Sequence, residues 1–109
     1  MKSPSLLASF RYAWEGITHA FRTQRNFRIH TVISAAAGAA GLLLRVGGTE
    51  WAVLILTIGL VFLAELFNTA LEAVVDHVAP EFHALAKIAK DCAAGAVFVA
   101  ALAAVGVGV

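Results

Sequence analysis

Apolar and polar positions alternate with helical spacing over the first quarter of the chain. Apolar side chains recur from Leu6 through Trp14 to Phe21, and cations gather on the opposite face. This amphipathic pattern, with a tryptophan among its apolar positions, is typical of a helix that lies in a membrane interface. It predicts a surface helix over about residues 4–25, with Ser3 as N-cap and Pro4 at the first helical position.

Three longer apolar segments follow, each with the length of a membrane span. They cover about residues 28–46, 50–76 and 83–108 and are separated by Gly47-Gly48 and by Pro80. The shortest has 16 uncharged residues between Arg28 and Arg45, about 24 Å of helix, which snorkelling of these arginines would extend. We therefore expect residues 1–109 to form a single all-α membrane domain, with one surface helix and three transmembrane helices.

Composition and charge support this reading. Hydrophobic residues make up 61% of the 109 residues and charged residues only 14%, so lipid must cover part of the apolar surface. Five cations crowd the first quarter of the chain: Lys2, Arg11, Arg22, Arg25 and Arg28. The only cation in the turn between the first and second spans is Arg45, whereas the region after the second span has Lys87 and Lys90. The positive-inside rule places the N-terminus and residues 76–91 in the cytoplasm and the C-terminus outside.

A series of polar residues interrupts the second predicted span. Glu65, Asn68, Glu72 and Asp76 fall at i, i+3, i+7 and i+11, so a helix places them on one face, which we call the acidic stripe. A carboxylate at the middle of a membrane helix costs about 2.5–3.5 kcal/mol. The stripe should therefore face protein, water or a bound cation, and we expect it to run from mid-membrane to the cytoplasmic surface. Further polar residues follow its end: Glu81, His83, Lys87, Lys90 and Asp91.

This combination suits phosphoryl transfer at a membrane surface, which needs a base, a metal ligand and a phosphate clamp. Glu65, the more buried acid, is the candidate base, and Glu72 the candidate Mg²⁺ ligand. No P-loop or HExxH motif occurs, and the histidines are too dispersed to indicate a transition-metal site. Two alternatives remain at this point. Lys87 and Asp91 also fit an ordinary solvated helix start, and intramembrane acids also occur in ion-coupled transporters.

Two segments carry a resemblance to a known family. Glu65-Leu-Phe-Asn-Thr-Ala-Leu-Glu-Ala-Val-Val-Asp76 and Ala86-Lys-Ile-Ala-Lys-Asp-Cys-Ala-Ala-Gly-Ala-Val97 resemble the bacterial diacylglycerol kinase/undecaprenol kinase family. Tyr12–Gly16 and Arg25–His30 also fit, so the similarity covers nearly the whole chain. The resemblance implies a homotrimeric kinase of the bacterial cytoplasmic membrane that uses ATP and Mg²⁺, with composite active sites between subunits. Small residues at 34–41 and 93–95 would allow the helices to approach closely.

The resemblance also implies roles for individual residues. Glu65 matches the family's catalytic base and Asn68 its hydrogen-bonding neighbour, while Glu72 matches a glutamate that binds the metal and thereby the nucleotide. The other nucleotide contacts fall at Tyr12, Glu81, His83, Lys90 and Asp91. Where the family pattern has a second metal-binding glutamate, this chain has Gln24, which offers an oxygen but no charge.

The acceptor lipid follows less directly from the sequence. Residues 14–16 and 25–30 look more like the undecaprenol kinase branch, which makes undecaprenyl phosphate. The alternative is a diacylglycerol kinase that makes phosphatidic acid, and a small ion-coupled transporter is a more distant alternative. Both lipids present a primary hydroxyl, so the acid–base residues do not discriminate between them.

Overall fold

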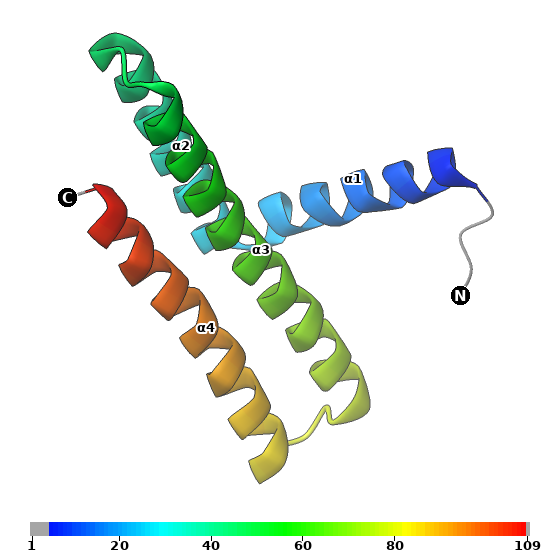
Figure 1. Ribbon diagram of the computed structural model, residues 1–109. Helices are drawn as coiled ribbons and strands as arrows, with labels where there is room; N and C mark the ends of the chain where they lie inside the picture. The colour runs from blue at the N-terminus through cyan, green and yellow to red at the C-terminus, as the bar shows by residue number, and fades with distance from the viewer. Residues whose placement is uncertain (1–4, 109) are drawn as a thin grey trace.

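The computed structural model describes residues 5–108, and these form four helices (Figure 1). The helices are α1 (Leu6–Thr23), α2 (Arg25–Leu44), α3 (Gly48–Val78) and α4 (Ala84–Gly108). No strand occurs within 5–108, and α2, α3 and α4 are each long and apolar enough to cross a membrane. The predicted fold class is confirmed. The predicted helix start at Ser3-Pro4 lies outside the described residues, and Ser5 caps α1 by accepting a hydrogen bond from the Ala8 N–H at 3.1 Å.

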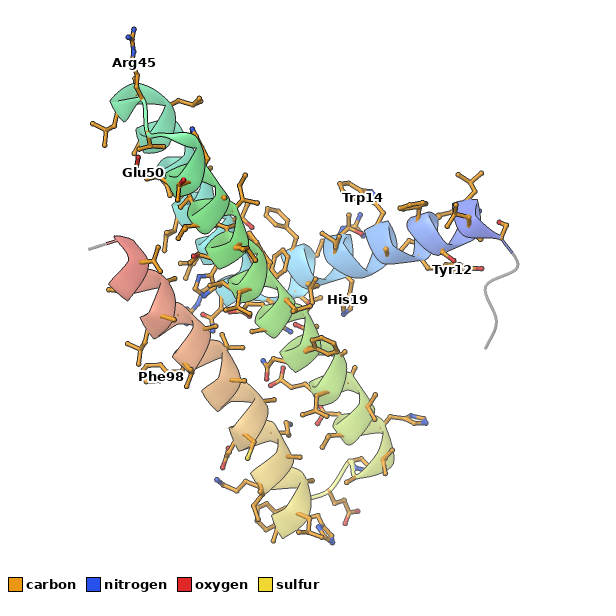
Figure 2. All side chains as sticks on the ribbon, viewed as in Figure 1. Tyr12, Trp14, His19, Arg45, Glu50 and Phe98 are labelled. Carbon is orange, nitrogen blue, oxygen red and sulfur yellow. The ribbon has the colours of Figure 1, made fainter. Side chains whose placement is uncertain are left out.

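Large apolar side chains remain exposed along the three long helices. Leu43 on α2 is 84% exposed and Phe98 on α4 is 64% exposed, and Figure 2 shows Phe98 directed away from α3. Water would make such surfaces unfavourable, whereas hydrocarbon covers them without cost. The isolated chain therefore has the surface of a membrane protein.

A sharp elbow joins α1 to α2. Only Gln24 separates the two helices, and α1 projects sideways from the long helices (Figure 1). The Arg28 guanidinium donates hydrogen bonds to the backbone oxygens of Phe21 at 2.9 Å and Arg22 at 3.0 Å. These carbonyls belong to the last turn of α1, which has no further helical partners. Arg28 thus ties the end of α1 to the start of α2. The interfacial position of α1 stays a prediction.

The hairpin of α2 and α3 is held by close packing at both ends. Arg45 ends α2 in the left-handed conformation, with φ 56° and ψ 48°. Near this turn the Trp51 ring packs on Gly41, where an added Cβ would lie 2.9 Å from Trp51 Cη2. At the other end the rings of Phe27 and Phe62 lie 5.1 Å apart between centroids. These contacts fix the register of the two helices.

In this register, α2 does not pack against the last part of α3. Because Phe27 in the first turn of α2 meets Phe62, the residues of α3 beyond about Leu66 extend past the elbow. The length of α3 agrees with this, since 31 residues make about 46 Å of helix while the hydrocarbon core is about 30 Å thick. The structure therefore places Glu65 beside the elbow, and its depth in the membrane stays a prediction.

Helix α4 packs along α3 and, within the described chain, makes no contact with α2 (Figure 1). An open, mostly apolar cleft of about 660 Å³ lies between α2, α3 and the second half of α4. The small residues of α2 that were expected to meet another helix, including Ser34, Ala37 and Gly41, line this cleft. Trimer formation stays a prediction.

Candidate active site

Glu65 is the most deeply buried ionisable residue at the elbow. It is 2% exposed, and its Oε1 atom lies 3.2 Å from Nε2 of His30 on α2. The pair lies within ion-pair distance, but no hydrogen bond forms to Oε1. Sequence reasoning missed His30, because the four histidines are scattered along the chain. The signal that could have found it is the tight α2–α3 hairpin, which brings the start of α2 back to the middle of α3.

Asn68 lies one turn after Glu65 and shares an unusual property with it. Oδ1 of Asn68 and Oε1 of Glu65 are both buried, and neither accepts a hydrogen bond from the described residues. An unpaired buried polar atom costs about 1–3 kcal/mol, so proteins rarely keep one without a use. The first two members of the acidic stripe therefore have free acceptor capacity for a ligand at the elbow.

The later members of the stripe connect α3 to α4. Glu72 is half-buried on α3, and Asp76 accepts a hydrogen bond from Lys90 Nζ at 2.8 Å. Lys87 donates to Asp91 at 2.6 Å on the exposed face of α4. Exposed ion pairs of this kind contribute little to stability, because water screens the charges. Both lysines can therefore leave their carboxylate partners for a phosphate at little cost.

A pocket of about 360 Å³ lies where α3 turns into α4. Its lining unites the predicted nucleotide-binding residues of this region with the two ion pairs: Asp76, Glu81, His83, Lys87, Lys90 and Asp91. His83 also accepts a hydrogen bond from the Leu85 N–H at 3.1 Å through Nδ1, which holds the imidazole at the start of α4. The structure thus gathers residues that the sequence only placed near one another.

Tyr12 does not join this pocket within one chain. It lies on the outer part of α1, well away from the turn between α3 and α4 (Figure 2). The Arg11 guanidinium lies 5.3 Å from the centre of its ring. The predicted nucleotide contact by Tyr12 therefore needs either a second subunit or a movement of α1.

The donors offered to a metal ion are few. Within residues 5–108, no three His, Cys, Asp or Glu side chains come close enough to hold one. Gln24 is half-buried at the elbow and makes no side-chain capping bond to α2. Mg²⁺ that arrives with a nucleotide takes most of its ligands from phosphates and water and needs only one or two carboxylates. The half-buried Glu72 carboxylate fits that requirement. The described residues do not supply the larger set of ligands that a metal site made of protein groups alone would need.

Comparison with known proteins agrees with this arrangement. Residues 11–109 match the prokaryotic diacylglycerol kinase family. A diacylglycerol kinase of Synechocystis sp. is 60% identical over 107 residues, which are 97% of this chain and 61% of that protein. The undecaprenol kinase of Bacillus subtilis is 45% identical over 94 residues, 86% of this chain and 76% of the relative.

A third relative has a lower identity. The diacylglycerol kinase of Escherichia coli is 35% identical over 94 residues, 86% of this chain and 77% of that protein. The chain spans less than two thirds of the Synechocystis protein and about three quarters of the other two. The match covers α2, α3, α4 and α1 from residue 11 onward, and with them the acidic stripe, its lysine partners and the elbow. This chain belongs to the prokaryotic diacylglycerol kinase family.

Proposed function

We propose that this protein transfers the γ-phosphate of ATP to the primary hydroxyl of a membrane lipid. The observation that carries the proposal is the buried Glu65 carboxylate, which accepts no hydrogen bond from the described residues and lies one turn from the unpaired Oδ1 of Asn68. A lipid headgroup reaches the depth of the elbow, and a nucleotide reaches the pocket at the turn between α3 and α4 from water. The acidic stripe joins the two places.

The residues divide the reaction between them. Glu65 accepts the proton of the lipid hydroxyl as the hydroxyl oxygen attacks the γ-phosphorus. The bond from this phosphorus to the β–γ bridging oxygen breaks, and ADP is released. Asn68, one helical turn from Glu65, orients the hydroxyl by donating a hydrogen bond from its side-chain NH2 to the hydroxyl oxygen. Lys90 exchanges Asp76 for a phosphate oxygen, and Asp91 holds the nucleotide together with Glu81 and His83, which line the same pocket.

Glu72 is the residue we assign to the metal. Mg²⁺, when bound with the nucleotide, neutralises charge on the β- and γ-phosphates. Gln24 stands at the position of the family's second metal-binding glutamate and would add an amide oxygen without charge. A site with one protein carboxylate should need more Mg²⁺ than a site with two.

We assign undecaprenol as the acceptor, with diacylglycerol as the alternative. Residues 14–16 and 25–30 resemble the undecaprenol kinase branch, and the relatives bear both names. An apolar groove of about 570 Å³ between α1 and the α2–α3 hairpin offers room for a hydrocarbon chain beside the elbow. Its lining includes Trp14, Phe21, Phe62 and Leu66.

The membrane arrangement follows from the same reasoning. The three long helices support a bacterial membrane protein. We propose that the N-terminus and residues 76–91 face the cytoplasm, where ATP is available, and that the C-terminus faces outward. A homotrimer would let α1 of one subunit bring Tyr12 to the nucleotide pocket of another.

The test is transfer of labelled γ-phosphate from MgATP to undecaprenol and to diacylglycerol, assayed side by side in mixed micelles. We expect phosphorylation of undecaprenol, and loss of activity to background in Glu65→Gln. Glu50→Gln is the matched control, since Glu50 lies in the first turn of the same helix and accepts a hydrogen bond from the Gly47 N–H at 2.8 Å, which an amide oxygen can also do. Phosphorylation of diacylglycerol alone would move the assignment to the other branch. An active Glu65→Gln variant would remove Glu65 from the role of base.

A further inference from the structure

The pair formed by His30 and Glu65 has no place in the reaction described so far. The two residues come from different helices, and their side chains are 21% and 3% exposed. We propose that His30 is a positioning residue that orients the Glu65 carboxylate toward the lipid hydroxyl. This inference rests on the proposed kinase function. It means that a residue of α2 sets the orientation of the catalytic base on α3.

No other described side chain is ion-paired or hydrogen-bonded to this carboxylate. Thr31 and Thr69 flank the pair, but both hydroxyls donate to backbone oxygens of their own helices, to Phe27 at 2.8 Å and to Glu65 at 2.9 Å. The lysine nearest to the stripe, Lys90, is bonded to Asp76. Within residues 5–108, the imidazole of His30 is therefore the charged or ionisable donor that lies within ion-pair distance of Glu65.

The backbone around the pair is held independently. Phe27 and Phe62 lie three residues before His30 and Glu65, respectively, and their rings pack against each other at 5.1 Å. The side chain of Arg28 fixes the end of α1 against the same turn of α2. His30 therefore approaches Glu65 from a rigid frame, which is the condition for a residue that sets the direction of a catalytic group.

Orientation matters here because the two carboxylate oxygens are not equivalent. Oε1 is enclosed and faces the imidazole, so the other oxygen is left to accept the proton. Hydrogen bonds in a catalytic group are often long before substrate binds and shorten in the reacting complex. A small approach of Nε2 to Oε1 would lock the carboxylate in one rotamer as the lipid enters.

Two amide substitutions test the proposal. His30→Gln keeps a donor that can reach Glu65, whereas His30→Asn has the same amide on a side chain one methylene shorter. We expect His30→Asn to lower kcat at least about 10-fold, because general-base catalysis contributes about 10²–10⁴-fold in total. His30→Gln should recover most of that loss, and KM for ATP should stay unchanged in both variants. His19→Asn, at an exposed histidine of α1, is the control and should behave as wild type (Figure 2).

The outcomes separate this inference from the function on which it rests. If the wild-type protein phosphorylates lipid and His30→Gln and His30→Asn have equal kcat, the positioning role alone is overturned. A wild-type protein without lipid kinase activity would overturn both. A double variant gives an independent reading, since Glu65→Asp already withdraws the carboxylate from the imidazole. Adding His30→Asn to Glu65→Asp should then cost little more, and a fully additive loss of kcat would contradict direct coupling.

Discussion

The contact between Gly41 and Trp51 makes a sharp prediction about the α2–α3 hairpin. A Cβ at position 41 would lie 2.9 Å from Cη2, 3.1 Å from Cζ2 and 3.4 Å from Cζ3 of the Trp51 ring. A rigid indole cannot yield as a flexible side chain would. Overpacking of this kind costs about 1–3 kcal/mol, so Gly41→Ala should loosen the hairpin.

Gly38 offers a matched control on the same helix. A Cβ there meets no atom within 4 Å, so Gly38→Ala only gains helix propensity, at most about 1 kcal/mol. Because Gly41→Ala receives the same gain, the stability difference between the two variants isolates the collision. We expect Gly41→Ala to be less stable than Gly38→Ala by about 1–3 kcal/mol.

The measurement is thermal or denaturant unfolding in one detergent, followed by far-UV circular dichroism. Trp51→Phe removes much of the colliding ring, so Gly41→Ala should cost less on a Trp51→Phe background than on the wild type. Equal stability of Gly41→Ala and Gly38→Ala would refute the reasoning, since it would mean that the indole does not sit on the α2 backbone.

Further predictions concern the elbow, the ion pair and the metal. Arg28→Met removes two hydrogen bonds to the end of α1, at about 0.5–1.5 kcal/mol each, and should speed backbone hydrogen exchange in residues 20–24 while leaving α4 unchanged; equal exchange in both proteins would contradict the tie. Lys90→Met should raise KM for ATP, whereas Asp76→Asn, which frees the lysine, should raise it far less; similar KM values in the two variants would argue against phosphate binding by Lys90. Gln24→Glu should lower the Mg²⁺ concentration that gives half-maximal activity, and an unchanged Mg²⁺ curve would place Gln24 away from the ion.

The elements of this protein are largely determined by its sequence. Apolar segments bounded by Arg28, Gly47-Gly48 and Pro80 predicted the three long helices, because helix length and hydropathy are local properties. The acidic stripe is local too, since i, i+3, i+7 and i+11 share a face of any helix. The family match confirms the resemblance drawn from the segments around Glu65 and Lys90.

What only the tertiary structure decided is which residues of different helices meet. The ion pair of Asp76 with Lys90 depends on how α4 folds back along α3, and the pairing of His30 with Glu65 depends on the register of the α2–α3 hairpin. That register follows from the left-handed turn at Arg45 and the close fit of Trp51 on Gly41. Such contacts arise from packing between segments that are distant in sequence. The periodicity of residues within one helix does not predict them.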